Sequence, residues 1–420
     1  MIGSTRVHLN GDGSNHNGPI FIAAEARLIY GTARAISRSS VVTISGGQGV
    51  LELEVTVPDA EIGSLAGSGV LRMPIGTTLS TGFNNQDAMF SGILLAPSDF
   101  LFQQTFRKVG SGTQTFNGLF GGIAYNGRFV IDDGTLRLSG LFRTNRSNAV
   151  HIGASGTLDL NGVSQEIASL TGSGRIVSGG GTLSFGHDNA NTSFGGTLVD
   201  NGLFEKNGTG TSWLTGDSGT FVGDVRVNAG TLALVRGALS AVQVDVQPGG
   251  RFELAGGVLN VDTINGDLFH DGGTLSAGNS PGTMRINGDY WLSNLGSLAV
   301  ELAGVAQGSE YDFYDVTGNV YLSGGTLDIE LIPPHTLDLG QTYDILRVGG
   351  LLAGRFDGLD EGALLGTFGG VDLLLTYRAG DGNDIALFTA PAPVPLPAAL
   401  PMLIAGLGAA VAVSRRRRPQ

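Results

Sequence analysis

EIGSLAGSG at residues 61–69 returns as EIASLTGSG at residues 166–174, 105 positions later, and this repetition determines the fold. Seven of the nine positions are identical in the two copies. Further matches follow in the same order, with FRKVGSGT at 106–113 corresponding to FEKNGTGT at 204–211. An internal repeat predicts a stacked architecture, because each unit can bury its apolar face only against its neighbours.

Within the repeats, apolar and polar residues alternate with a period of two. GTLRL at 134–138, GTLAL at 230–234 and VQVDV at 242–246 place apolar side chains on one face, as short strands require. Glycine, asparagine or aspartate interrupts these stretches every few residues and can adopt the positive φ that tight turns need. The pattern predicts many short strands that end at glycine turns. The triplet GTL alone starts at residues 134, 156, 181, 196, 230, 273 and 325.

These strands indicate an all-β fold, a parallel β-solenoid. In such a coil each turn lies about 4.8 Å above the previous one, and inward Val, Leu and Ile side chains stack into one core. A β-propeller is disfavoured because no regular period of about 40 to 50 residues is present. A β-sandwich would need longer apolar strands and fewer glycines. The spacing of the repeats is irregular, so the sequence does not assign individual turns.

The chain is expected to divide into four parts. Residues 1–40 would begin the solenoid, residues 41–290 would form its repeat-containing body, and residues 291–390 would continue it or close it with a β-rich cap. A cap would cover the strand edges that the last turn leaves unpaired. Residues 391–420 differ in composition, since six of the 14 prolines lie there. Residues 1–20 lack the basic and apolar regions of a secretory signal, so an exported protein would carry that signal upstream of this start.

Two stretches give the repeats a family resemblance. The segment from FEKNGTGT at 204–211 to VRVNAGTL at 225–232 resembles the autotransporter-associated β-strand repeat of passenger domains. The segment from GTLSAGNSPG at 273–282 to INGDY at 286–290 is similar to the part that follows such repeats in bacterial surface proteins. The resemblance implies a right-handed parallel β-helix that is exposed outside the cell. Because no membrane barrel of the autotransporter kind follows it, secretion by self-translocation is not expected.

The C-terminal tail resembles a bacterial sorting signal. The apolar run from Leu396 to Val413 has 18 residues, which as a transmembrane helix would span about 27 Å of the hydrocarbon core. The arginines that follow would hold this end in the cytoplasm; they are Arg415, Arg416, Arg417 and Arg418. The motif before the helix resembles the VPLPA form of the PEP-CTERM signal of Gram-negative bacteria and consists of Val394, Pro395, Leu396, Pro397 and Ala398. The resemblance implies an inner-membrane intermediate, processing by an exosortase-type protease, and delivery to the cell surface or the medium.

The composition excludes several classes of function. The chain has 70 glycines, no cysteine, and 37 acidic against 24 basic residues, for a net charge of −13. Without cysteine there is no disulfide framework, iron–sulfur cluster or cysteine nucleophile. Nucleic acid is not an expected partner, because binding it requires clustered Lys and Arg to neutralise phosphates. No cofactor motif is present, and the acidic body favours solubility outside the cell.

Catalytic motifs occur only as isolated matches. GDSG at 216–219 has the serine setting of some proteases, but no histidine motif accompanies it. GNSPG at 278–282 fits the hydrolase pattern, but proline follows the serine where a helix should begin. Both are interpreted as turns, and no catalytic residue is predicted. The histidines show no metal-ligand spacing; they are at positions 8, 16, 151, 187, 270 and 335.

One calcium candidate lies near the end of the β-rich part. Asp381, Asn383 and Asp384 in GDGNDI at 380–385 offer the oxygen ligands that calcium prefers. Calcium-binding repeats need tandem turns, and this is a single turn, so a terminal β-turn is the preferred interpretation. The sequence therefore predicts no metal site, and these three residues are only a weak calcium candidate.

Two hypotheses of function follow. The preferred one is a non-catalytic, exported cell-surface or extracellular-matrix protein that acts in adhesion, biofilm formation or exopolysaccharide association. The alternative is a polysaccharide lyase or hydrolase, since fold alone does not distinguish a binding β-helix from an enzyme. An enzyme would need Asp, Arg and Lys on consecutive turns, and Asp132, Asp133, Asp188 and Asp200 follow no such spacing. The expected partners are the exosortase-type protease, the membrane before processing, and an extracellular polysaccharide.

Overall fold

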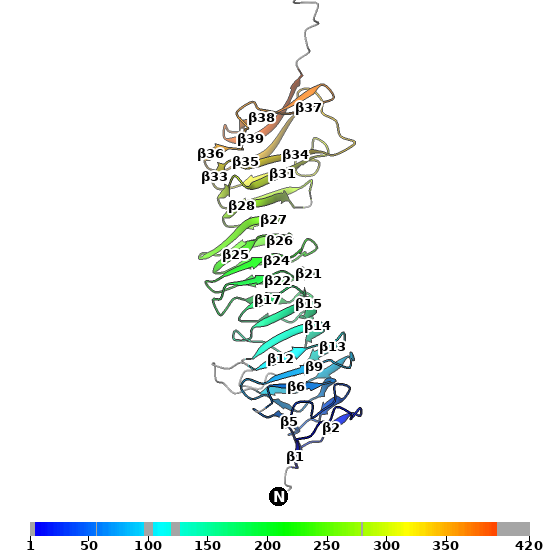
Figure 1. Ribbon diagram of the computed structural model, residues 1–420. Helices are drawn as coiled ribbons and strands as arrows, with labels where there is room; N and C mark the ends of the chain where they lie inside the picture. Colours follow the sequence, from blue (N-terminus) through cyan, green and yellow to red (C-terminus); the bar gives the residue numbers. More distant parts are fainter. Residues whose placement is uncertain (1–4, 56, 96–103, 119–126, 279, 393–420) are drawn as a thin grey trace, which may run out of the picture.

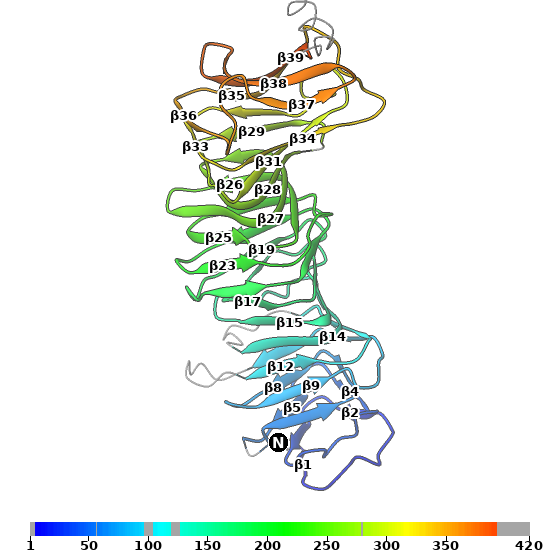
Figure 2. The same ribbon diagram turned by 45° about the horizontal axis from the view of Figure 1, so that its top comes forward.

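The computed structural model describes residues 5–55, 57–95, 104–118, 127–278 and 280–392. These residues form one elongated coil of stacked strands (Figure 1). A view turned by 45° shows the same coil, with the turns following the chain from the N-terminal end to the cap (Figure 2). No helix occurs in the described residues. The predicted all-β solenoid is confirmed, and it is of the right-handed type expected for parallel crossover connections.

The strands are short because a glycine or polar turn follows most of them. The first part of the coil contains β1 (Arg6–Leu9), β2 (Ile20–Ile22), β3 (Arg27–Tyr30), β4 (Val41–Ile44), β5 (Val50–Leu53), β6 (Asp59–Ile62), β7 (Ser64–Gly67), β8 (Val70–Arg72), β9 (Thr78–Thr81), β10 (Ala88–Phe90), β11 (Ile93–Leu95), β12 (Thr105–Lys108) and β13 (Thr113–Phe116). The middle part contains β14 (Arg128–Leu138), β15 (Val150–Asp159), β16 (Gln165–Glu166), β17 (Leu170–Gly172), β18 (Arg175–Val177), β19 (Thr182–Phe185), β20 (Thr192–Phe194), β21 (Thr197–Val199), β22 (Leu203–Lys206), β23 (Thr211–Leu214), β24 (Asp224–Val227), β25 (Gly230–Leu234) and β26 (Ala238–Val246). The last part contains β27 (Gly250–Asn265), β28 (Leu268–Ala277), β29 (Thr283–Asn287), β30 (Tyr290–Leu292), β31 (Gly296–Leu302), β32 (Phe313–Val316), β33 (Val320–Ser323), β34 (Thr326–Leu331), β35 (Thr342–Val348), β36 (Leu352–Arg355), β37 (Leu364–Phe368), β38 (Val371–Ala379) and β39 (Asp384–Pro391).

Neighbouring turns pair in parallel and in register. Phe129 of β14 pairs with Val150 of β15, which pairs with Leu170 of β17. Residues one turn apart are commonly about 20 positions apart in the sequence, as for His151 and Thr171. Closer to the cap a turn is longer, and Asp289 lies 30 positions from the Asn319 that it contacts on the next turn. This change in turn length explains why the repeat spacing is irregular in the sequence.

The core is a continuous column of inward side chains. In β31 fully buried and partly buried positions alternate along the whole strand, so the period of two in the sequence corresponds to the inside and the outside of the coil. Phe106, Phe116, Phe129 and Phe142 fill one section of the interior, with ring centroids of successive pairs 4.8 to 6.5 Å apart. Burying this apolar column provides the main driving force for folding, because the chain has no disulfide.

The repeated glycines lie where one turn passes close to the next. Gly110 and Gly208 occupy equivalent positions of the repeat and have φ values of 67° and 68°. A Cβ atom at Gly110 would lie 2.2 Å from the carbonyl oxygen of Gly82, and one at Gly208 would lie 2.0 Å from that of Gly186. Both the backbone conformation and the space therefore require glycine at these corners.

The chain's two lysines are buried at equivalent positions beside these corners. Each ammonium donates to three backbone carbonyl oxygens at distances of 2.6 to 3.3 Å, so it ties a turn of the chain to the next turn. Burial lowers the pKa of both side chains to about 8, and both are charged at pH 7. The acceptors are the carbonyl groups of Val109, Gly110 and Asp133 for Lys108, and of Asn207, Gly208 and Ala229 for Lys206.

The C-terminal end of the coil changes from parallel to antiparallel pairing. β36 is still parallel to β33, whereas β37, β38 and β39 form an antiparallel meander. β39 also pairs antiparallel with β35, which belongs to the last turns of the coil. Through this pairing the meander covers the edge that β35 would otherwise leave open at the end of the coil.

The expected transmembrane helix at 396–413 and the sorting motif lie outside the described residues, as do the four arginines after them. Within the described part of the chain, no helix is long and apolar enough to cross a membrane.

Candidate functional site

One outward-facing row of the coil gathers aromatic side chains. The pairing register places Trp213, Ala233, Glu253, Phe269, Trp291 and Tyr321 at the same position of six successive turns. The residues on either side of Trp213, Phe269, Trp291 and Tyr321 along each strand are buried, so these four side chains point outward. We call these four residues the aromatic row. It includes both tryptophans of the chain.

Three members of the aromatic row form a stack. The ring centroids of Phe269 and Trp291 are 4.7 Å apart with planes 6° from parallel, and those of Trp291 and Tyr321 are 5.4 Å apart with planes at 12°. The Arg251 guanidinium lies 3.6 Å from the centroid of Phe269, in a cation–π contact. Because Phe269 and Trp291 each have neighbours on both ring faces, they present mainly their edges to solvent.

Trp213 differs from the stacked rings. Trp213 is an exposed residue, with 38% of its surface accessible. No other ring packs against it among the described residues, and its indole N–H has no hydrogen-bond partner there. Exposed tryptophan combines a large apolar face with a polar N–H, a combination that is enriched at binding interfaces.

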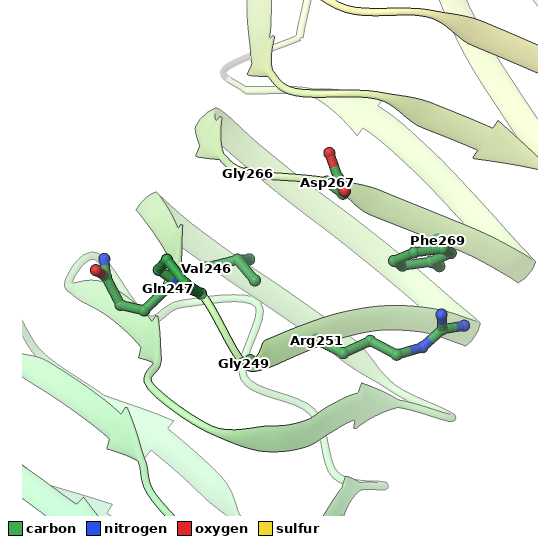
Figure 3. Close-up of a pocket in the computed structure, with 9 residues that line it drawn as sticks. Val246, Gln247, Gly249, Arg251, Gly266, Asp267 and Phe269 are labelled. Carbon is green, nitrogen blue, oxygen red and sulfur yellow. The ribbon is translucent and has the colours of Figure 1, made fainter.

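A groove of about 460 Å³ adjoins this row at a corner of the coil (Figure 3). One wall is the turn before β27, where the Gly250 N–H donates to the Gln247 carbonyl at 2.8 Å and Gly249 has a φ of 96°. Figure 3 shows the Phe269 ring above the extended Arg251 side chain on one side of the groove. Phe269 therefore belongs to both the row and the groove. The lining consists of Val246, Gln247, Pro248, Gly249, Gly250, Arg251, Gly266, Asp267 and Phe269.

The electrostatics of the groove are dominated by carboxylates. The Arg251 guanidinium lies 3.4 Å from a Glu253 oxygen and 3.3 Å from an Asp271 oxygen, so two acidic groups already share its charge. Asp267 lines the groove as a third carboxylate, and its Oδ1 accepts a hydrogen bond of 2.9 Å from the Asp289 N–H. One cation among three anions gives the groove a net negative charge.

Several other arginines of the outer surface form ion pairs between turns. Arg137 contacts Asp159 at 2.7 Å, and Asp315 is contacted by Arg285 at 2.8 Å and by Arg347 at 2.5 Å. Such pairs use the rigid guanidinium fork, whereas both lysines are inside the coil. The charge of these arginines is neutralised locally, and acidic residues outnumber basic ones in the chain by 37 to 24.

The two motif serines have no catalytic partners within the described chain. Ser218 Oγ is buried and accepts a hydrogen bond of 2.9 Å from the Leu198 N–H. Ser280 Oγ donates to Asp312 Oδ2 at 2.7 Å, and neither serine contacts an imidazole. Burial raises the pKa of the Asp312 carboxyl, which also accepts backbone hydrogen bonds from Gly282 and Glu301. This carboxylate therefore joins three segments of the coil.

A serine–histidine pair occurs elsewhere. Ser184 Oγ lies 3.0 Å from His187 Nε2, and burial lowers the pKa of His187. Asn207 Nδ2 donates to the same hydroxyl at 2.8 Å, and Ser184 is buried. A nucleophile must reach a substrate carbonyl, whereas this hydroxyl is engaged by His187 and Asn207 on a residue that is only 5% exposed. The pair is best described as a structural contact between turns.

His270 is buried as well. Its Nδ1 lies 2.9 Å from the Tyr290 hydroxyl and its Nε2 lies 3.0 Å from the Gly273 carbonyl oxygen. Burial lowers its pKa to about 4, so the ring is neutral over the ordinary pH range.

The calcium candidate lies at the junction of the coil and the cap. Asp384 Oδ1 accepts a hydrogen bond of 2.7 Å from the Val348 N–H, and Asn383 Nδ2 donates to the Gly350 carbonyl at 2.6 Å. These side chains hold β39 against the end of β35. Among the described residues, no group of three or more His, Cys, Asp or Glu side chains could hold a metal ion.

No family model matches the chain. It is 29% identical over 281 residues to a curated protein named adhesin BmaC autotransporter, from Brucella suis biovar 1 (strain 1330). The matched segment covers 64% of this chain and 7% of that protein, so the chain spans only a small part of its relative's length.

Sequence reasoning missed the aromatic row. Its members lie at positions 213, 269, 291 and 321, and these intervals are too uneven to stand out as a period. Only the register, with its varying turn length, brings them onto one face. The one signal available was that both tryptophans occupy outward positions of alternating strands.

Proposed function

We propose that this protein is an exported, non-catalytic β-helix that acts at the cell surface or in the extracellular matrix as an adhesin. The observation that carries the proposal is the similarity to an autotransporter adhesin over 64% of this chain. A long solenoid with an exposed aromatic row and a groove is also suited to binding along its side. Adhesion, biofilm formation and association with exopolysaccharide are the activities that this surface would support.

The route of export is part of the proposal. VPLPA at 394–398, the apolar run and the four arginines support an inner-membrane intermediate that an exosortase-type protease releases. Mass spectrometry of the mature protein tests this directly. We expect the C-terminal peptide to end near the VPLPA motif at 394–398 and to lack the rest of the apolar run and Arg415–Arg418. An intact C-terminus on surface-exposed protein would contradict processing.

The adhesin role is tested by deleting the gene and measuring attachment of cells to abiotic surfaces and to neighbouring cells. The deletion strain should attach less than the parent strain, and the full-length gene should restore attachment. Equal attachment of the two strains in both assays would contradict the role.

A further inference from the structure

We propose that the aromatic row and the adjoining groove form a binding site for a neutral polysaccharide chain that lies along the axis of the coil. This inference rests on the proposed surface function and specifies the ligand class and the residues that bind it. Three features of the surface support it: the exposure of Trp213, the alignment of the row with the groove, and the local charge.

Trp213 provides the accessible apolar surface of the site. Trp213 has no ring neighbour in the described chain and keeps 38% of its surface accessible, so part of the indole can contact a ligand. Sugar rings carry C–H groups on their faces and hydroxyl groups around their edges. An aromatic face next to polar groups that fix orientation is the usual composition of a small-molecule site.

Trp213 and the groove beside Phe269 are aligned along the axis of the coil. Trp213 and Phe269 are separated by three turns, which is about 14 Å along the axis. The intervening Ala233 is small and buried, and Glu253 pairs with Arg251 at the edge of the groove. An extended polymer parallel to the axis could therefore contact Trp213, pass over Ala233 and reach the groove beside Phe269. A compact ligand could contact only one end.

The charge of the groove disfavours an anionic ligand. Arg251 is already compensated by Glu253 and Asp271, and Asp267 adds a further negative charge. A polyuronate or a sulfated chain would meet carboxylates of the same sign, and the one cationic residue that lines the groove, Arg251, is already paired. Neutral sugar hydroxyls can donate to these carboxylates and accept from the Trp213 N–H, the Arg251 guanidinium and the Gln247 amide. The site therefore selects for uncharged glycans.

Tryptophan fluorescence of the full chain provides the test, because both tryptophans belong to the row. Cellohexaose and dextran serve as neutral probes, and polygalacturonate serves as the acidic probe. We expect a saturable change in emission with at least one neutral probe and none with polygalacturonate. Isothermal titration with the same probes gives the affinity of each variant.

Two variants identify the site. Trp213→Ala should weaken binding of the neutral glycan by about tenfold or more, as expected for loss of a central aromatic contact. Phe21→Ala is the matched control, because Phe21 is an exposed aromatic residue far from the row, with 69% of its surface accessible. It should bind like the wild type. Circular dichroism of both variants should match the wild type, since neither residue belongs to the core.

Binding of neither neutral probe would overturn the inference, as would equal binding of polygalacturonate or equal losses in the two variants. Failure of the proposed adhesin role and failure of the glycan site would give different results. If cells carrying Trp213→Ala attach like the wild type while the deletion strain does not, the adhesin role stands and the glycan site is wrong. If purified protein binds the glycan but deletion leaves attachment unchanged, the site stands and the adhesin role is wrong.

Discussion

At the scale of single residues, the buried lysines show how the repeat is held together. An ammonium without a carboxylate partner is costly to bury, yet each lysine satisfies three carbonyl oxygens at a corner where the backbone turns. The recurrence of Lys108 and Lys206 in the sequence therefore reflects a structural requirement. Their burial makes both unavailable to ligands of the outer surface.

Replacing Lys206 with methionine should lower the free energy of unfolding by about 2 kcal/mol, because buried carbonyl groups lose their donor. Urea titration followed by circular dichroism measures the change. Arg107→Met is the control, since the Arg107 side chain is half exposed, and it should change stability by less than about 0.5 kcal/mol. Equal effects of the two substitutions would contradict a structural role for the lysine.

The lysines also predict a dependence of stability on pH. Their pKa is about 8 in the folded chain and 10.5 for the unperturbed side chain, so between these values the unfolded chain binds more protons. The contribution of the two lysines to the free energy of unfolding therefore rises as pH increases from 8 to 10.5. The same contribution is lost as pH falls through 8. Relative to a Lys108→Met/Lys206→Met variant, the wild type should be more stable at pH 10 than at pH 7. Urea midpoints of both proteins at both pH values test this, and a constant difference would refute it.

The requirement for glycine at a corner of the coil can be tested by comparing the stability of alanine variants at two positions. Gly208→Ala would place Cβ 2.0 Å from the Gly186 carbonyl oxygen, whereas Gly249→Ala meets nothing within 4 Å. Both glycines have positive φ, so both substitutions are strained by about 1 kcal/mol. Gly208→Ala should lower the free energy of unfolding by at least about 1 kcal/mol more than Gly249→Ala does, because the neighbouring turn that contains Gly186 must move. Thermal melting of the two variants makes the comparison, and equal losses would show that close packing is unimportant.

At the scale of elements, the strands were predictable and their partners were not. The alternation in GTLRL at 134–138 defines an inner and an outer face whether the neighbouring strand is parallel or antiparallel. For that reason the sequence left open whether residues 291–390 continue the coil or cap it, and the structure contains both a parallel section and an antiparallel meander. The aromatic row was hidden for a related reason, since it depends on turn lengths that the sequence does not reveal.

The junction of the cap provides a prediction at this scale. Asp384→Ala removes the acceptor of the Val348 N–H, and we expect the cap to loosen and the free energy of unfolding to fall by about 1 kcal/mol. Calcium should not raise the melting temperature of the wild type, because Asn383 and Asp384 are engaged with the backbone. A calcium-dependent rise that disappears in Asp384→Ala would instead establish a metal site at this turn.

At the scale of the whole molecule, the coil separates stability from recognition. Inward residues, corner glycines and buried lysines determine the fold, while the outward positions can vary without disturbing the core. The chain is acidic overall, several outer arginines are paired between turns, and three outward aromatic rings stack on successive turns. This division is suited to a rod that presents one binding face outside the cell.

The central claim is that the coil is displayed outside the cell. Brief trypsin treatment of intact cells, followed by mass spectrometry of the released peptides, tests it most directly. Cleavage after exposed arginines such as Arg146 should release peptides of the coil while cytoplasmic marker proteins stay intact. Recovery of these peptides only after cell lysis would contradict surface display.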